Sequence, residues 1–157
     1  MTHRFIEYPA YPAVASIQTR LAYEMNHRIV ESNGIKMHLA ENGEGPLVVF
    51  CHGYPEFWYS WRHKLKALAE AGYHIVAPGQ RGYGQTDRPE AVDRYNLLQL
   101  TGDIVGLVEA LGETEAVIVG HDWGSAVAWS CALLRPDIFR AVVLLSVPYI
   151  MGGHSPD

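Results

Sequence analysis

The chain has 157 residues, 48% of them hydrophobic, and carries 12 Lys and Arg against 17 Asp and Glu, a formal net charge of −5. This acidic balance leaves no basic patch for nucleic acid, and no apolar run approaches the ~20 residues that a membrane span needs. Residues 1–9 lack the uninterrupted apolar segment of a secretory signal. The sequence therefore predicts a cytoplasmic protein with neither nucleic-acid nor membrane partners.

Residues 1–26 show no clear hydrophobic period, and we interpret them as an N-terminal extension before a partial core domain at 27–157. Ser32-Asn33-Gly34 separates two short β-type segments, which is a hairpin signal. The expected strands are 28–31, 35–40, 46–51, 73–76, 117–119 and 139–147, and the expected helices are 60–71, 97–111 and one running to about 134. This alternation is typical of an α/β fold with a mostly parallel sheet, here of about six strands with flanking helices.

The most informative segment follows the apolar run 117–119 and reads Gly120-His121-Asp122-Trp123-Gly124. A strand, then Gly-x-Asp-x-Gly, then a helix is the layout of a nucleophile elbow, with aspartate in place of the usual serine. A carboxylate that attacks saturated carbon forms an ester that water can cleave, whereas a serine would leave an inert ether. Asp122 is therefore the candidate nucleophile. The alternative is an ordinary turn residue or helix N-cap.

A second candidate segment follows the apolar strand 46–51 and reads His52-Gly53-Tyr54-Pro55. In hydrolases of this layout, one backbone amide from this loop and one from the residue after the nucleophile form the oxyanion hole. The amides of Tyr54 and Trp123 would fill these roles here, and the alternative is a simple turn. The residues expected to shape the site are His52, Gly53, Pro55, Gly120, His121 and Gly124.

Three further features have structural interpretations. The glycine-rich segment 79–89 lacks the spacing of a phosphate-binding loop, so we expect a structural loop. Glu56 is expected to begin a helix, where a carboxylate favours the dipole. Cys51 and Cys131 are expected to be free core thiols, with no metal and no cofactor. Leu133, on the helix after the elbow, is expected in the core.

These motifs together resemble the N-terminal half of soluble epoxide hydrolases of the α/β-hydrolase superfamily. The resemblance runs from about residue 27 to 148 and rests on four segments: 52–63, 81–84, 119–124, and 135–137 with 146–148. It implies a small-molecule epoxide substrate, opened to a diol through an alkyl ester on Asp122. It also implies that the cap tyrosines and the late catalytic Asp and His of the family are missing from this chain.

The same resemblance implies the sheet order 1-2-4-3-5-6-7-8, so that strand 139–147 would be a free edge and a site of self-association. Gly79 stands where the family normally has Asp, which calls the order of the loop near His52 into question. Haloalkane dehalogenases usually have Asn where Tyr54 stands, and fluoroacetate dehalogenases have Arg where Trp123 stands. The remaining alternatives are a haloalkane dehalogenase-like hydrolase and an inactive or binding-only truncated fragment.

Overall fold

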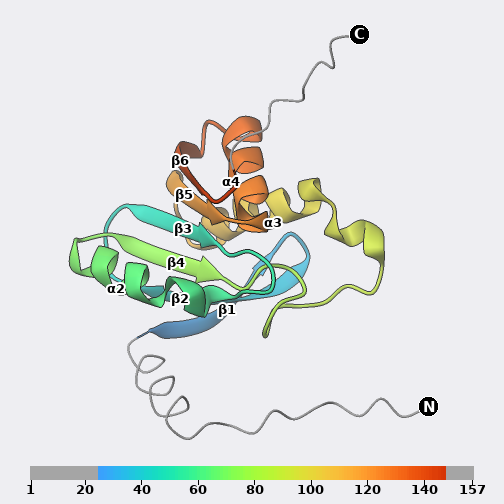
Figure 1. The fold of residues 1–157 in the computed structure, drawn as a ribbon, viewed down its shortest axis with the longest axis horizontal. Helices are drawn as coiled ribbons and strands as arrows, with labels where there is room; N and C mark the ends of the chain where they lie inside the picture. Colours follow the sequence, from blue (N-terminus) through green and yellow to red (C-terminus); the bar gives the residue numbers. More distant parts are fainter. Residues whose placement is uncertain (1–24, 148–157) are drawn as a thin grey trace, which may run out of the picture.

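The computed structural model describes residues 25–147, and these form one sheet with helices on both faces (Figure 1). The strands are β1 (Asn26–Ser32), β2 (Ile35–Asn42), β3 (Leu47–Cys51), β4 (His74–Pro78), β5 (Ala116–His121) and β6 (Phe139–Leu145). Their order is β1-β2-β4-β3-β5-β6; the β1–β2 and β2–β4 pairs are antiparallel, and the β4–β3, β3–β5 and β5–β6 pairs are parallel. The predicted α/β class, the mostly parallel sheet and the strand order are confirmed for these six strands. Residues 1–24 of the extension predicted at 1–26 lie outside the described residues. The extension therefore stays a prediction.

Three α-helices and two short 3₁₀ helices complete the described fold. The α-helices are α2 (Arg62–Glu70), α3 (Leu97–Ala110) and α4 (Trp123–Leu134), and the 3₁₀ helices are η1 (Trp58–Trp61) and η2 (Val92–Tyr95). Asn96 caps α3, because its side chain accepts a hydrogen bond from the Gln99 amide at 3.0 Å. Gly112 follows α3 with φ +78°, the left-handed backbone that ends many helices.

The hairpin between β1 and β2 turns at Asn33 and Gly34, whose φ angles are +48° and +74°. Two consecutive residues with positive φ make the type I′ turn that matches the twist of paired strands. The ladder runs from Ser32 opposite Ile35 to Asn26 opposite Glu41, so both strands are about two residues longer at their open ends than predicted.

The sheet buries apolar side chains on both faces. One cluster joins the sheet to α3 and α4 through Ile104, Leu107 and Val127, and a second joins it to α2 through Trp61 and Leu65. All five residues of β3 are buried, as expected for a parallel strand covered on both sides. Each buried aliphatic or aromatic side chain contributes about 1.5–3 kcal/mol to folding. β3 and β5, which carry the candidate site at their carboxyl ends, are therefore held in the most buried part of the fold.

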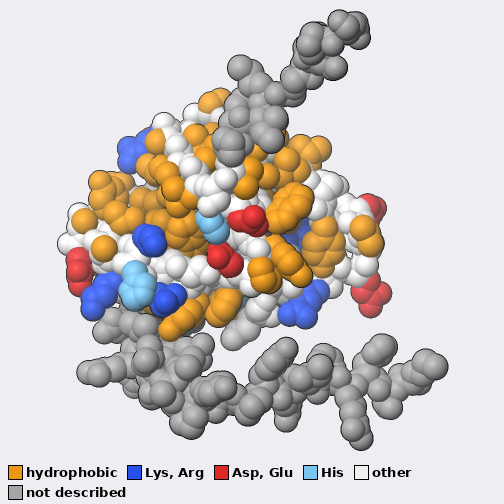
Figure 2. Space-filling model, viewed as in Figure 1, with side chains coloured by type: hydrophobic (Ala, Val, Ile, Leu, Met, Phe, Trp, Pro, Cys, Tyr) orange, Lys and Arg blue, Asp and Glu red, His pale blue; other side chains and the backbone are white. Residues whose placement is uncertain are grey.

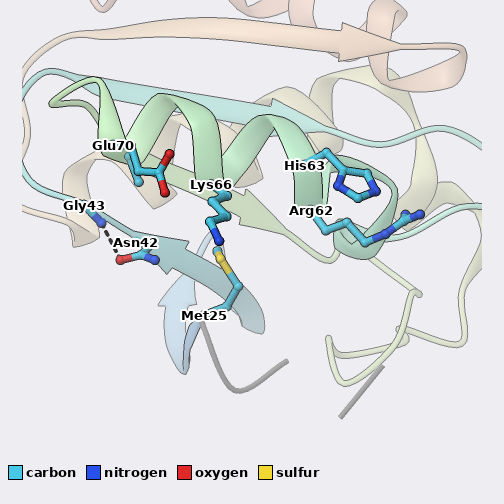
Figure 3. Close-up of a pocket in the computed structure, with 8 residues that line it drawn as sticks. Met25, Asn42, Gly43, Arg62, His63, Lys66 and Glu70 are labelled. Carbon is cyan, nitrogen blue, oxygen red and sulfur yellow. Dashed lines mark hydrogen bonds between the residues drawn. The ribbon is translucent and has the colours of Figure 1, made fainter. Parts of the chain in front are cut away.

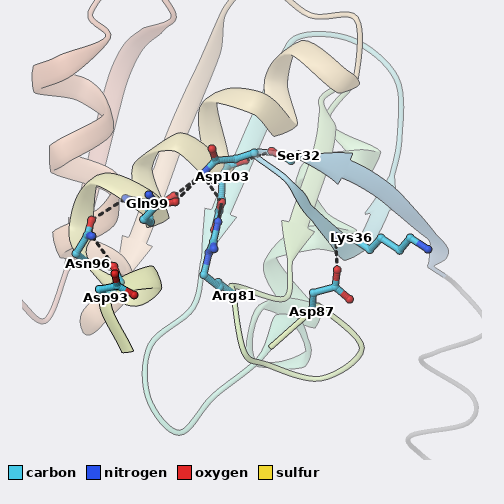
Figure 4. A network of polar contacts seen from close by, with 9 residues as sticks. Ser32, Lys36, Arg81, Asp87, Asp93, Asn96, Gln99 and Asp103 are labelled. Carbon is cyan, nitrogen blue, oxygen red and sulfur yellow. Dashed lines mark hydrogen bonds and ion pairs between the residues drawn. The ribbon is translucent and has the colours of Figure 1, made fainter. Parts of the chain in front are cut away.

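A buried polar network fixes the glycine-rich loop (Figure 4). The Arg81 guanidinium donates to both carboxylate oxygens of Asp103, at 2.8 and 2.5 Å, and both side chains are almost fully buried. Asn33 donates to the same carboxylate at 2.9 Å, and the Ser32 hydroxyl donates to the Asp103 carbonyl at 2.6 Å. The network ties loop 79–89, the β1–β2 turn and α3 together. This confirms that the loop is structural.

One sequence-based expectation about this framework is wrong. Leu133 is not in the core: it is 55% exposed. Helix α4 is apolar nearly all round, so its sequence could not indicate which face packs on the sheet. Gly79, whose effect the sequence left open, is bonded on both sides: its amide donates to the His38 carbonyl at 2.8 Å and its carbonyl accepts from the Thr86 hydroxyl at 2.6 Å.

Candidate active site

Asp122 lies at the sharp turn between β5 and α4, as the elbow layout predicts. Its backbone has φ 54° and ψ −125°, a left-handed conformation that costs a non-glycine residue about 1–3 kcal/mol. Bonds on both sides hold this strained residue. Its carbonyl accepts from the Ser125 amide at 2.9 Å, and its own amide donates to the Leu145 carbonyl at 3.2 Å. The turn therefore presents the carboxylate at the carboxyl end of the sheet, at the start of α4.

The glycines around the elbow are required by close approach. A Cβ on Gly120 would lie 2.6 Å from Cα of Ser125, and a Cβ on Gly124 would lie 2.7 Å from the His52 carbonyl oxygen. A Cβ on Gly53 would lie 2.7 Å from Oδ1 of Asp122. Real side chains do not tolerate such distances, so α4 and the loop after β3 reach Asp122 only because these residues are glycine.

Two backbone amides face the Asp122 carboxylate. The Tyr54 amide donates to Oδ1 at 3.0 Å, and the amide of the adjacent Trp123 also acts on the carboxylate. These two amides, with a smaller contribution from the nearby His121, hold the pKa of Asp122 below its usual value. The side chains of Tyr54 and Trp123 are 68% and 70% exposed, so both residues meet Asp122 through their backbones. The described chain thus brings the candidate nucleophile and both candidate oxyanion donors together.

His52 lies behind the Gly53–Tyr54 loop, where hydrogen bonds to both ring nitrogens hold it in place. Its Nδ1 donates to the Gly53 carbonyl at 2.9 Å, and its Nε2 accepts the Gln80 amide at 3.0 Å, so both ring nitrogens are in use. The Tyr83 ring lies edge-on against it at 4.7 Å between centroids. The side chain is fully buried, and this burial lowers the pKa of His52. His52 therefore braces the Gly53–Tyr54 loop and is not free to move protons.

The structure corrects the expectation for Glu56. This residue precedes η1 and begins no helix; its carboxylate accepts a hydrogen bond from Nδ1 of His121 at 3.1 Å. The two side chains are 34% and 33% exposed, and the Trp61 ring lies edge-on to His121. Sequence reasoning missed this pair because its members are 65 residues apart and meet only when β3 and β5 pair.

A cavity of about 310 Å³ opens beside the loop that holds Asp122. Its lining residues are His52, Gly53, Tyr54, Gln80, Arg81, Tyr83, Tyr95, Leu97, Leu100, Trp123, Ala126 and Val127. The only charged side chain among them, Arg81, is already paired with Asp103. Figure 2 shows hydrophobic side chains over much of the face in view, with Asp, Glu, Lys, Arg and His side chains scattered among them. The surroundings of the candidate site therefore suit an uncharged, mostly apolar small molecule.

Comparison with known proteins identifies this architecture. The family model described as the alpha/beta hydrolase fold matches residues 46–157. The chain belongs to the α/β-hydrolase fold family.

Relatives within the α/β hydrolases confirm the resemblance to epoxide hydrolases. Epoxide hydrolase A of Mycobacterium tuberculosis is 49% identical over 131 residues, which is 82% of this chain and 41% of that protein. An epoxide hydrolase of Caballeronia sordidicola is also 49% identical, over 80% of this chain and 38% of its own length. This α/β hydrolase chain therefore spans about two fifths of the length of these curated relatives.

Solved structures agree with the sequence relatives. A crystal structure of an epoxide hydrolase from Vigna radiata matches with a TM-score of 0.82 and 50% identity, covering 86% of this chain and 44% of that one. An epoxide hydrolase from an endophytic Streptomyces matches with a TM-score of 0.79 and 54% identity, covering 81% of this chain and 38% of that one. The described α/β-hydrolase core is thus the same core that these epoxide hydrolases have.

The α/β hydrolase chain has a second, larger cavity of about 450 Å³ between α2 and the end of β2 (Figure 3). Arg62, His63, Lys66 and Glu70 line it from α2, with Met25 and Asn42 across from them. It shares no lining residue with the cavity beside Asp122. The Arg62 guanidinium stacks on the Tyr59 ring at 4.4 Å and donates to the Tyr59 carbonyl. This cavity is therefore separate from the one beside the elbow.

Both cysteines of this α/β hydrolase lie in the core of the described structure. Cys51 and Cys131 are free and buried, as predicted, and burial raises the pKa of Cys131 to about 12. Within residues 25–147, no group of three or more His, Cys, Asp or Glu side chains could hold a metal ion. No helix in the same range is long and apolar enough to cross a membrane.

Proposed function

We propose that the chain carries the nucleophile half of an epoxide hydrolase site, with Asp122 as the nucleophile. The observation that supports this most is the Tyr54 amide on Asp122 Oδ1 at 3.0 Å, joined by the Trp123 amide. These donors lower the pKa of Asp122 and orient its carboxylate, which is in the ionised form that nucleophilic attack requires. The epoxide hydrolases among its relatives support the same substrate class.

In the first proposed step, one Asp122 oxygen attacks an epoxide carbon. The carbon–oxygen bond of the ring breaks, and its electron pair leaves on the ring oxygen, which then takes up a proton. A positioned acid is normally worth about 10²–10⁴ in rate at such a step. In epoxide hydrolases the cap tyrosines supply it. The 157-residue chain by itself must use water as the acid, so we expect slow alkylation.

In the second proposed step, water adds to the carbonyl carbon of the Asp122 ester. The negative charge that develops on the carbonyl oxygen would be held by the amides of Tyr54 and Trp123. Removing one such donor typically costs about 2.7–4 kcal/mol in the transition state. Collapse of this intermediate releases the diol and restores the carboxylate. The histidine that activates water in the family would come from a later part of the fold, so we expect the ester to persist on this chain.

The test is the stoichiometry of the reaction between the 157-residue chain and a styrene-type epoxide. The proposal predicts one adduct of epoxide mass per chain by intact mass spectrometry, and no more than one equivalent of diol. A parallel reaction with a bromoalkane tests the dehalogenase alternative through bromide release. No adduct with the epoxide would overturn the proposal in favour of an inactive fragment. Sustained diol production would contradict the expected need for a further base and acid.

A further inference from the structure

Two segments that are far apart in the sequence meet at the candidate nucleophile. The loop after β3 carries the Tyr54 amide, and the end of β5 carries His121 and Asp122. Two hydrogen bonds join them: the Tyr54 amide donates to Asp122 Oδ1 at 3.0 Å, and His121 Nδ1 donates to Glu56 Oε2 at 3.1 Å. The first belongs to the proposed chemistry. The second bond, between His121 and Glu56, takes no direct part in the two proposed steps.

Glu56 and Tyr54 belong to one hydrogen-bonded turn, so a displacement of Glu56 also displaces the Tyr54 amide. The Glu56 amide donates to the Gly53 carbonyl at 3.1 Å, which closes residues 53–56 into one turn. The Tyr54 side chain is 68% exposed, so it packs little and does not anchor the turn. His52 holds the near end of the loop through its ring, and the Glu56 carboxylate reaches β5 at the far end.

His121 is well placed to hold that far end. Its ring lies edge-on to the buried Trp61 ring, with 6.3 Å between centroids, so the imidazole has a fixed apolar neighbour. A carboxylate can only accept, so Nδ1 carries the proton in this bond. Because His121 directly precedes Asp122, a bond to its ring fixes the turn relative to the nucleophile itself. A displacement of a donor by about 1 Å can cost on the order of 10² in rate.

We infer that the Glu56–His121 pair is a clamp that positions the Tyr54 amide against Asp122. Glu56 and His121 are thus positioning residues for both proposed steps, since the same amide faces the carboxylate before attack and the oxyanion during hydrolysis. The inference rests on the proposed function for its catalytic consequence, but its structural content concerns only the Tyr54–Asp122 hydrogen bond. A clamp differs from a catalytic base in what it asks of His121. A clamp needs only a hydrogen-bond donor at the Nδ1 position, whereas a base must accept a proton.

Four variants separate these roles. Glu56→Ala and His121→Ala each remove the bond. Glu56→Gln keeps an oxygen acceptor for His121, and His121→Asn keeps an N–H donor near the place of Nδ1. If the pair is a clamp, the two single Ala variants lose the Tyr54–Asp122 contact and the rate of adduct formation to a similar extent. The double Ala variant is then no worse than either single one, and Glu56→Gln and His121→Asn keep most of the contact and the rate. The matched control is Glu115→Ala, which removes an exposed pair of the same length, 3.0 Å to Arg140, at the opposite end of β5.

The direct readout is the Tyr54 amide proton in ¹H–¹⁵N NMR spectra of the 157-residue chain, with thermal melts to confirm folding. We expect this resonance to move upfield in both Ala variants and to stay near its parental position in Glu56→Gln, His121→Asn and Glu115→Ala. The rate of adduct formation should fall about tenfold in the Ala variants, because a displaced turn no longer orients the Asp122 carboxylate for attack.

Each outcome decides a separate point. An unmoved Tyr54 resonance in folded Glu56→Ala and His121→Ala overturns the clamp. If His121→Asn keeps the parental resonance but loses rate as fully as His121→Ala, His121 is a proton acceptor and the clamp is wrong as its role. If the resonances move as expected but the parent forms no adduct, the clamp stands and the proposed function fails.

Discussion

The two ends of helix α4 differ in how completely the described chain surrounds them. At its start, Gly124 and Ser125 are buried under β3 and β5, and Asp122 is held by backbone bonds on both sides. At its end, Leu133 and Leu134 are 55% and 54% exposed. The site is held by contacts among β3, β5, the start of α4 and the last residue of β6, whose Leu145 carbonyl accepts from the Asp122 amide. None of these contacts involves the exposed end of α4.

Strand β6 is exposed along its outer edge, although its last residue, Leu145, holds the Asp122 amide. Among the described residues it pairs with β5 alone, and Val142, Val143 and Leu145 are 39%, 45% and 38% exposed. An edge strand with exposed apolar side chains invites pairing with another chain. The comparison teaches that the buried turn around Asp122 and the exposed apolar surface have separate determinants, and the predictions below test each of them.

The largest effect is expected from Asp122→Asn. Loss of the carboxylate should lower adduct formation by at least about 10³-fold, because an amide is a far weaker nucleophile. Folding should be unaffected, since the side chain is partly exposed and Asn tolerates a positive φ. Intact mass and a urea melt check both parts. Asp137→Asn, at an exposed acid paired with Arg135, is the control; alkylation at the parental rate in Asp122→Asn would remove Asp122 from its proposed role.

Gly124→Ala tests the packing at the buried end of α4. Its Cβ would lie 2.7 Å from the His52 carbonyl oxygen, so we expect a loss of about 3 kcal/mol in the free energy of unfolding. Gly72→Ala is the control, because a Cβ at this position would meet no atom within 4 Å. Its only expected loss in the free energy of unfolding comes from the φ of +85° and is about 1–2 kcal/mol. Urea denaturation of both variants measures the difference. Equal losses would show that close approach at the elbow is not what requires Gly124.

At the exposed end, we expect the 157-residue chain to self-associate through β6. Val143→Lys places a charge on this apolar edge and should shift the chain towards monomer. Light scattering at micromolar concentrations measures the association of both proteins. Lys36→Glu, on the exposed surface of β2, controls for a general effect of charge. A parent chain that is monomeric throughout, or a Val143→Lys variant that associates equally, would exclude β6 as the contact.

The smallest effect concerns pH. The amides of Tyr54 and Trp123 lower the pKa of Asp122, so its carboxylate stays ionised well below neutral pH. We expect the rate of adduct formation, corrected with Asp122→Asn, to be flat between about pH 7 and pH 5 and to fall only as the pH drops through the lowered pKa. The midpoint of this fall should lie below the ~3.9 of an ordinary Asp. A midpoint at or above that value would mean that the two amides do not act on the carboxylate.

Local patterns predicted most of the fold. The Asn33-Gly34 turn, the fully apolar β3 and the strand–Gly-x-Asp-x-Gly–helix order each depend on neighbours in sequence, and all are found. What could not be predicted depends on tertiary contact. Glu56 meets His121 across 65 residues, and Leu133 is exposed because a helix that is apolar all round does not specify its packed face.

The candidate site shows the same division between features that local sequence predicts and features that depend on tertiary contact. The resemblance indicated Asp122, Tyr54 and Trp123 because the elbow and loop motifs are local in sequence. It did not indicate that His52 has both ring nitrogens in use, since that follows from the Gln80 amide brought by β4. Nor could it indicate that Arg81 and Asp103 hold the neighbouring loop, because a buried ion pair between a loop and a helix leaves no local pattern.

The most direct test of the account is the position of the adduct. The chain has 17 Asp and Glu residues, all of them possible sites for a reactive epoxide. After brief reaction with a styrene-type epoxide, peptide mapping by tandem mass spectrometry should find the ester on Asp122 alone, with Glu56 and the exposed Asp137 unmodified. An ester spread over several exposed carboxylates, or one concentrated on a residue other than Asp122, would contradict the claim that the elbow creates the nucleophile.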